Sequence, residues 1–240
     1  FLKEKNIVTI PSYTNLFVKE STPFMSSFGA YATNSGPYEK DMVGIYYITP
    51  PDTNWTNEER EKYIMSRNEL LFTSVHEVWP GHFLQSIFIN KNNSLISKIF
   101  WHYTANEGWA HYTEEMMYEE GLGNYSPDYE IAMRLWALTR DVRFIVSIKM
   151  HTEGMTVEEA TQMFLKYAYK DEAGARQEAF RGTFDPQYYS YTLGKIFIRD
   201  LKNKWMAQNS SQDLKEFHSK FLSYGNVPIT LIEKDMMKTN

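Results

Sequence analysis

The middle of the chain contains the stretch His76-Glu77-Val78-Trp79-Pro80-Gly81-His82. On a regular α-helix six residues turn through about 600°, so His76 and His82 would point in different directions. Pro80 has no N–H to donate to the carbonyl of His76, so the helical hydrogen bonds must be interrupted or bulged there. Gly81 can adopt backbone angles that other residues avoid. We expect a bulge in this helix to return His82 to the face of His76.

This stretch is similar to the zinc motif HExxH, with two extra residues before the second histidine. In that motif both histidines bind the metal and the adjacent glutamate reaches the water that attacks the substrate. His76 and His82 are therefore the expected ligands of one Zn²⁺ ion, and Glu77 is the expected general base. The alternative, a buried helix with incidental polar residues, is disfavoured, because buried charge is costly without a partner or a metal.

A catalytic zinc usually keeps three protein ligands and one open position for water. Glu107 follows His82 by 25 positions on the next predicted helix and is the expected third ligand. Glu114 and Glu115, seven and eight residues further on, are the alternatives on a similar helix face. Gly108 would let this helix pack close to the metal.

The composition excludes several classes of protein. The net charge of −5 argues against nucleic acid as a partner, and the absence of cysteine excludes disulfides and thiolate metal sites. No apolar run approaches the roughly 20 residues of a membrane-spanning helix. No signal peptide is visible, but the chain begins with Phe1, and we expect it to be a fragment of a longer protein. A cytoplasmic location and an exported one, periplasmic or as a lipoprotein, both remain open, and the sequence does not indicate an oligomeric state.

The chain divides at about residue 55 into an irregular, proline-containing segment (1–55) and a helical region (56–240). The first segment contains two strand-like runs, Ile7–Ile10 and Val43–Ile48. Helices are expected from Thr56 through Val75, from about Ser94 to Glu119, from Ser126 to near Gly154, from Thr156, over 172–180, 187–208 and 212–223, and after Pro228. The predicted fold class is mainly α, with a small β element near the N-terminus.

Four segments together resemble the bacterial domain-of-unknown-function family 885. They are HEVWPGHFLQ (76–85), EGWAHYTEEM (107–116), the pair Arg143 and His151, and QYYSYTLG (187–194). The resemblance covers roughly residues 40 to 225. This family is related to helical zinc peptidases such as angiotensin-converting enzyme, thimet oligopeptidase and Taq carboxypeptidase, and its members are usually longer on the N-terminal side. The resemblance implies a zincin-like helical fold and peptidase activity.

The resemblance also implies roles for residues late in the chain. Similar peptidases place a tyrosine there to donate a hydrogen bond to the oxyanion, and Tyr191 is the candidate, with Tyr188 and Tyr189 as competitors. A packed core tyrosine is the alternative for Tyr191. Arg143 is expected either to bind a substrate carboxylate or to form an ion pair within the helical bundle. His151 is expected either to hydrogen-bond a substrate carbonyl or to interact with the dipole of a helix C-terminus.

His111, one helical turn after Glu107, either faces the substrate or makes a structural hydrogen bond. For the whole chain, the leading interpretation is zinc-dependent hydrolysis of peptide bonds in oligopeptides. The alternatives are a zinc amidase that acts on a small-molecule or cell-wall amide, and a catalytically silent binding domain. A purely structural zinc site would use four protein ligands and would not need Glu77 as a base.

Overall fold

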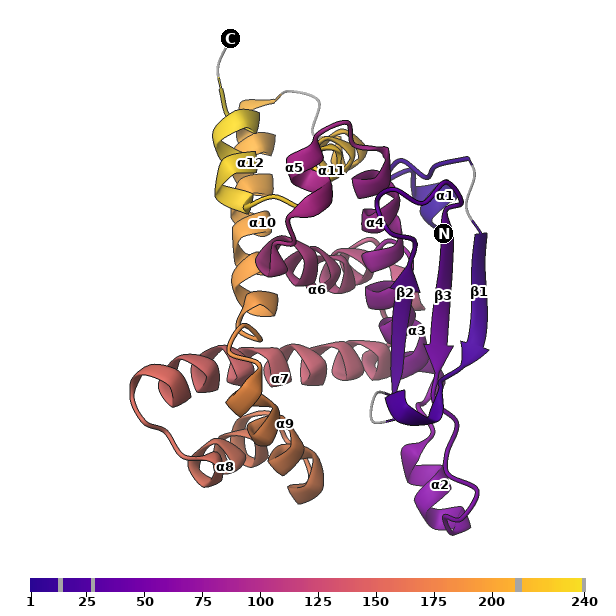
Figure 1. The fold of residues 1–240 in the computed structure, drawn as a ribbon, viewed down its shortest axis with the longest axis vertical. Coiled ribbons are helices and arrows are strands. Elements are labelled where there is room, and N and C mark those ends of the chain that lie inside the picture. Colours follow the sequence, from indigo (N-terminus) through magenta and orange to yellow (C-terminus); the bar gives the residue numbers. More distant parts are fainter. Residues whose placement is uncertain (13–14, 27–28, 210–212, 239–240) are drawn as a thin grey trace.

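The computed structural model describes residues 1–12, 15–26, 29–209 and 213–238 (Figure 1). The described residues are mainly helical, and three strands near the N-terminus form one sheet, so the predicted fold class is confirmed to this extent. The α-helices are α1 Leu2–Lys5, α2 Asn57–Tyr63, α3 Arg67–Glu77, α4 His82–Lys91, α5 Leu95–Ile99, α6 Tyr103–Glu119, α7 Pro127–Thr152, α8 Val157–Tyr167, α9 Glu172–Phe184, α10 Ser190–Gln208, α11 Leu214–Ser223 and α12 Ile229–Met236. Short 3-10 turns lie at Pro23–Met25 and Leu122–Tyr125.

The sheet consists of β1 (Asn15–Glu20), β2 (Ala30–Asn34) and β3 (Val43–Ile48), in the order β1-β3-β2. The central strand β3 pairs in parallel with β1 and antiparallel with β2. β2 is therefore an edge strand, and it contacts α3 and α4. The strand predicted at Val43–Ile48 is confirmed.

The strand predicted at Ile7–Ile10 is wrong. Ile7 and Val8 are buried in the helical core instead, where they pack with residues of α6, α10 and α11. The carbonyl of Ile7 accepts a hydrogen bond from His218 Nδ1 at 2.6 Å, so a side chain satisfies it rather than a neighbouring strand. Apolar alternation in this segment reflects contact with helices.

The helix predicted from Thr56 to Val75 is two helices. α2 begins at the predicted capping box of Thr56, but it ends at Tyr63. A second capping box then starts α3: the backbone N–H of Glu69 donates to the Ser66 hydroxyl at 3.2 Å, and Ser66 N–H donates to the Glu69 carboxylate at 2.8 Å. These reciprocal bonds satisfy N–H groups that a continuous helix would have bonded to preceding carbonyls.

The helix predicted from Ser94 to Glu119 is likewise two helices, α5 and α6, separated at residues 100–102. The predicted starts of α7 and α8 and the end of α6 before Gly121 are confirmed. The helices expected over 172–180, after 187 and after Pro228 correspond to α9, α10 and α12. The predicted start of α11 at residue 212 lies outside the described residues.

Helix α6 lies at the centre of the molecule, with α10 on one side and α3 and α4 on the other (Figure 1). Most of its side chains are buried, including the fully buried Trp109. Gly108 meets Gly194 of α10 so closely that a Cβ on Gly108 would lie 2.4 Å from the Gly194 Cα. The expectation that Gly108 brings α6 close to a metal is thus wrong, because the close approach is to α10.

No helix in the described ranges is both long enough and apolar enough to cross a lipid bilayer.

A buried histidine connects the N-terminal segment to the core. His218 on α11 is fully buried, its Nδ1–H donates to the Ile7 carbonyl, and its Nε2 lies 2.7 Å from the Tyr112 hydroxyl. Because Nδ1 carries the proton, Nε2 accepts the hydrogen bond from Tyr112. Burial lowers the pKa of His218 from 6.5 to about 4. The imidazole is therefore neutral in the folded chain at neutral pH.

We predict that this histidine makes the fold sensitive to acid. Below pH 6.5 the unfolded chain takes up a proton that His218 in the folded chain does not accept until about pH 4. The free energy of unfolding therefore decreases as the pH falls from 6.5 to about 4, by at most about 3 kcal/mol. Denaturant unfolding measures the free energy of unfolding of the wild type and of His218→Gln. The difference in favour of the wild type should shrink by this amount between pH 6.5 and pH 4. An advantage that does not change with pH would contradict the prediction.

Candidate metal centre

The two histidines of the HEVWPGH stretch lie on different helices. His76 occupies the last turn of α3, His82 is the first residue of α4, and the connection between them contains a cis peptide bond at Trp79–Pro80. The ring centroids of the two histidines lie 4.7 Å apart, with the planes at 85°. The predicted bulge within one helix is thus a complete break, and it brings the two imidazoles together as expected.

The break requires glycine at position 81, because there is no room there for a side chain. A Cβ on Gly81 would lie 1.8 Å from the carbonyl oxygen of His76, a distance that no side chain tolerates. The φ of Gly81 is −72° and its ψ is −129°, a combination outside the regions allowed to residues with a side chain, so the expected role in unusual backbone angles is confirmed. Its N–H donates to the carbonyl of Val75 at 3.0 Å, which closes the break tightly against the end of α3.

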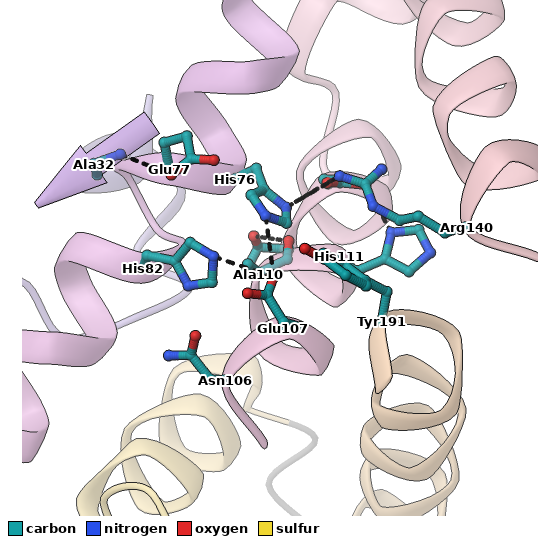
Figure 2. A network of polar contacts seen from close by, with 12 residues as sticks. Ala32, His76, Glu77, His82, Asn106, Glu107, Ala110, His111, Arg140 and Tyr191 are labelled. Atoms are coloured by element: carbon teal, nitrogen blue, oxygen red, sulfur yellow. Dashed lines mark hydrogen bonds and ion pairs between the residues drawn. The ribbon is translucent and has the colours of Figure 1, made fainter. Parts of the chain in front are cut away.

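Glu107 on α6 completes a three-residue cluster (Figure 2). Its Oε2 lies 3.5 Å from His76 Nε2 and 3.4 Å from His82 Nε2. The metal-ligating atoms of the three residues all lie within 4.8 Å of one another. In a tetrahedral zinc site with bonds of about 2.1 Å, two ligand atoms are separated by about 3.4 Å. The spacing from Glu107 to each imidazole therefore suits one zinc ion.

Two polar atoms of this cluster lack a hydrogen-bond partner among the described residues. Glu107 Oε2 and His82 Nδ1 are buried and have no hydrogen bond in the part of the chain that the structure describes. Buried polar atoms are rarely left without a partner, so an unpaired carboxylate oxygen between two imidazoles points to a bound cation. Two imidazole nitrogens and one carboxylate oxygen form a donor set typical of catalytic zinc. The residues therefore fit the metal.

Protonation in the metal-free chain also shows that this point needs positive charge. Burial acts to lower the pKa of His76, but the neighbouring carboxylates of Glu107 and Glu114 outweigh it and raise that pKa to about 9. Burial acts to raise the pKa of Glu107, but His82 and His76 outweigh it and hold that pKa well below its usual range. A metal ion would replace the proton on His76, so zinc should bind more weakly as the pH falls.

A second set of side chains lies behind His76 (Figure 2). Glu114 Oε1 accepts a hydrogen bond from His76 Nδ1 at 2.6 Å. Arg140 forms a two-point ion pair with Glu114, with Nη2 at 2.8 Å from Oε1 and Nη1 at 3.2 Å from Oε2. A carboxylate on Nδ1 fixes the proton there and leaves Nε2 free to bind a metal. Glu114 therefore orients a ligand and is not itself placed as one.

The other alternative ligand, Glu115, lies on a different face of α6. It pairs with Lys195 at 2.6 Å and with Arg199 at 2.9 Å. Neither Glu114 nor Glu115 shares the point where the three ligand atoms converge. Of the three candidate glutamates, the structure brings only Glu107 to the two histidines.

His111 does not face a substrate. It is 1% exposed, and its Nδ1–H donates to Glu114 Oε2 at 2.7 Å. Burial lowers the pKa of His111 to about 3, so it is neutral at physiological pH. The substrate-binding interpretation of His111 is wrong, and its structural alternative holds: it supports the carboxylate that orients His76.

The cluster of His76, His82 and Glu107 opens into a cleft of about 1230 Å³ that is lined by residues of β2, α3, α6, α7 and α9, among others. His76, Glu77, His82 and Glu107 all contribute to its lining. Glu77 Oε2 accepts a hydrogen bond from the backbone N–H of Ala32 at 3.1 Å. This bond holds the carboxylate between the end of α3 and the edge strand β2, beside the metal ligands (Figure 2).

Tyr191 lines the same cleft, in the first turn of α10. Its ring lies over His76 with centroids 6.2 Å apart and planes at 20°. Its hydroxyl accepts a hydrogen bond from Arg181 Nη2 at 3.3 Å. Burial raises the pKa of Tyr191, and the charge of Glu107 raises it further, so the phenol keeps its proton and can donate a hydrogen bond.

The competing tyrosines lie elsewhere. Tyr188 is fully buried in the core formed by α7, α8 and α9, a core that the Tyr191 ring also joins, and it is not among the residues that line the cleft. Tyr189 packs edge-on against Phe144, with ring centroids 6.4 Å apart. Of the three tyrosines, Tyr191 is the one among the residues that line the cleft.

The two other residues predicted to bind substrate, Arg143 and His151, both make contacts within the protein. Arg143 lines the cleft, but its guanidinium already binds Glu178 at two points, with Nε at 2.7 Å from Oε2 and Nη2 at 2.6 Å from Oε1. The ion-pair alternative for Arg143 therefore holds. His151 Nε2 lies 2.8 Å from the carbonyl of Gly182, so this side chain connects the end of α7 to α9. His151 is not among the residues of the cleft lining.

Sequence reasoning missed several residues of this site. Arg140 and Arg181 hold Glu114 and Tyr191, and Ala32 holds Glu77. The arginines lie on predicted helices near the recognised segments, but nothing in their spacing indicates which acidic group each one binds. The contact from Ala32 is made by its backbone N–H, which every residue except proline has, so the residue type at this position does not reveal it.

Residues 1–236 match the family described as "Bacterial protein of unknown function (DUF885)". No curated protein matches the chain. A solved structure described as "a putative lipoprotein of unknown function from Shewanella oneidensis" is 34% identical over 99% of the chain, with a TM-score of 0.87. "The putative lipoprotein from Colwellia psychrerythraea" is 25% identical over 98% of the chain, with a TM-score of 0.83. The chain spans 43% and 40% of these two proteins.

We predict that Glu114→Gln weakens zinc binding by about 10- to 100-fold, because an amide no longer fixes the proton on His76 Nδ1 as a carboxylate does. Competition with a chelator, followed on the folded protein by zinc content, measures the affinity. Glu115→Gln is the matched control on the same helix and should bind zinc as the wild type does. Equal affinities for both variants would show that Glu114 does not support the ligand.

Proposed function

The chain belongs to the bacterial family of unknown function DUF885, and we propose that it is a zinc-dependent hydrolase that cleaves peptide bonds in oligopeptides. One observation carries the proposal: His76, His82 and Glu107 converge on one point in a cleft that also contains Glu77. Three protein ligands leave a fourth zinc position open, as catalysis requires. A silent domain with a structural zinc would not need this open position.

His76, His82 and Glu107 would hold the zinc, which when bound supplies Lewis-acid polarisation of the scissile carbonyl and lowers the pKa of a water to about 7. Glu77 acts as the general base: it takes the proton from the attacking water and transfers it to the leaving amine nitrogen. The hydrogen bond from Ala32 holds one oxygen of Glu77 and so restricts the carboxylate to the position where it works.

Tyr191 donates a hydrogen bond to the oxyanion that forms on the scissile carbonyl. Its phenol keeps its proton because burial and the charge of Glu107 raise its pKa. Arg181 holds the hydroxyl oxygen from the other side, at 3.3 Å, and is itself paired with Asp185 at 2.8 Å. The donor is therefore oriented before the substrate binds.

The edge strand β2 favours a peptide over a small amide as the substrate. The N–H of Ala32 points out of the sheet, since it bonds to Glu77, and by strand alternation the polar backbone groups of Ala30 and Asn34 point the same way. All three residues line the cleft. An extended peptide can add to such an edge as a further strand beside Ala30 and Asn34, while the Ala32 N–H keeps its bond to Glu77. The cleft also exceeds the 300 to 1,000 Å³ that is typical of small-molecule pockets.

The description of both solved neighbours as a "putative lipoprotein" supports an exported location for this chain over a cytoplasmic one. We propose accordingly that the oligopeptide substrates are encountered outside the cytoplasm.

We predict that Glu77→Gln lowers turnover of fluorogenic oligopeptides by about 100-fold or more, because the amide cannot accept the proton of the attacking water. Zinc content, measured by elemental analysis, should equal that of the wild type, since Glu77 is not a ligand. Loss of zinc together with activity would show that the assigned roles are wrong. If the zinc-loaded wild type cleaves no peptide of a broad library but does cleave a non-peptide amide, the amidase alternative is correct.

We predict that Tyr191→Phe lowers kcat by about 100-fold and changes KM little, because the hydroxyl acts on the oxyanion and not on the ground state. Steady-state kinetics on one oligopeptide measures both constants. Tyr189→Phe removes a hydroxyl two residues earlier and outside the cleft, and it should leave both constants unchanged. A change in KM alone for Tyr191→Phe would reduce this tyrosine to a binding residue.

A further inference from the structure

The cleft wall formed by α7, α9 and the connection between α8 and α9 contains several cations. Three of them are arginines with carboxylate partners: Arg140 pairs with Glu114, Arg143 with Glu178, and Arg181 with Asp185. Their charges are thereby compensated. The fourth cation on this wall is Lys170.

Lys170 differs from the arginines. In the part of the chain that the structure describes, no carboxylate lies within ion-pairing distance of its Nζ, which instead lies 4.3 Å from the ring centroid of Trp136. Burial lowers the pKa of Lys170; the charges of Glu178 and Asp171 oppose this, and the charges of Arg143 and Arg140 lower the pKa further. Glu178 is already bound by Arg143 at two points, so the wall has an excess of positive charge at Lys170.

The backbone fixes Lys170 in this position. Tyr169, the residue before it, has a φ of +52° at the C-terminal end of α8, where glycine is usual. The N–H of Lys170 bonds back to the carbonyl of Phe164, and the next residue, Asp171, caps α9 through a bond from Gly174 N–H at 2.7 Å. A strained conformation between two helix ends is kept where the surroundings impose it, and such positions cluster at binding sites.

The surroundings of Lys170 connect it to the metal centre. Trp136 stacks with Phe72 at 6.4 Å between ring centroids, and both rings line the cleft. The guanidinium of Arg140 lies 5.7 Å from the Trp136 ring, and its Nη2 lies 3.4 Å from His76 Nδ1. Trp136 and Arg140 thus lie between Lys170 and His76, a proposed metal ligand. The stacked rings of Trp136 and Phe72 form an apolar surface beside them.

We propose that Lys170, with the Trp136 ring beneath it, forms a subsite that binds a carboxylate of the peptide substrate. This inference rests on the proposed function, since it names the substrate class of the same cleft. The ammonium of Lys170 can pair with an anionic group, and the Trp136 ring beside it can contact an apolar group. A suitable ligand therefore carries an anionic group next to an apolar side chain. The free C-terminal carboxylate and the side-chain carboxylate of an acidic residue share this chemistry.

Binding to the metal-free full chain tests the subsite without catalysis. The probes are N-acetylphenylalanine, its amide, and the α-amide of N-acetylglutamic acid, titrated by NMR with the Trp136 indole signal as reporter. N-acetylphenylalanine should bind about tenfold or more tightly than its amide, as expected for a charge-assisted contact. Lys170→Gln should abolish this difference and Lys170→Arg should retain part of it.

Lys98→Gln is the matched control, since Lys98 also lines the cleft and lies 5.5 Å from the ring of Tyr38, but on α5, far from α8 and α9 (Figure 1). This variant should keep the preference for the acid. If the glutamate probe matches the phenylalanine acid, the subsite binds side-chain carboxylates as well. Equal binding of acid and amide by the wild type, or equal loss in both glutamine variants, would overturn the proposal.

The same variants tested on peptides separate the two proposals. The peptide substrates are an oligopeptide that carries the carboxylate and the same oligopeptide with an amide in its place. On zinc-loaded protein, Lys170→Gln should raise the KM of the carboxylate peptide about tenfold or more and leave its kcat nearly unchanged. Both constants of the amide peptide should also stay nearly unchanged. If no peptide is cleaved but acid binding depends on Lys170, the subsite stands and the proposed hydrolysis fails. If peptides are cleaved with no effect of Lys170, the hydrolysis stands and the subsite fails.

Discussion

His76 lies between two buried carboxylates, Glu107 on its Nε2 side and Glu114 on its Nδ1 side. Charges at such depth are unfavourable unless each is compensated, and removing one partner of a buried pair typically costs about 3 to 5 kcal/mol. Arg140 compensates Glu114, and His111 adds a neutral donor. Among the described residues, the ion-pairing partners of Glu107 are the imidazoles of His76 and His82, so a proton or a metal must compensate its negative charge. The arrangement of α3, α4, α6 and α7 around this point follows from that requirement.

The packing of α6 against α10 links the ligand to the proposed oxyanion donor. Gly108 directly follows Glu107, and it meets Gly194, three residues after Tyr191. A side chain at either glycine would push the helices apart, because a Cβ on Gly194 would lie 2.1 Å from the carbonyl oxygen of Thr104. The contact that brings the two backbones together therefore also sets the distance between the metal cluster and the tyrosine.

Sequence reasoning predicted the parts of this site that depend on local pattern. The Pro80-Gly81 interruption predicted that His76 and His82 meet, although it could not distinguish a bulge from a full break. Sequence reasoning failed for contacts between distant segments. Arg143 binds Glu178, 35 residues away, and nothing in the spacing of the two residues indicates that contact. The division between α2 and α3 could have been predicted, because Ser66 and Glu69 form a capping box as readable as the one at Thr56.

The candidate metal site and the sheet are not separate units, although composition divides the chain at residue 55. Ala32 lies in the β segment, and its N–H holds the carboxylate of Glu77 at the end of α3. β2 in turn keeps its position by pairing with β3 along its whole length. A base that must stand at one distance from the attacking water needs support on both sides. The edge strand supplies that support on the side away from the helices, so the N-terminal sheet belongs to the proposed catalytic unit.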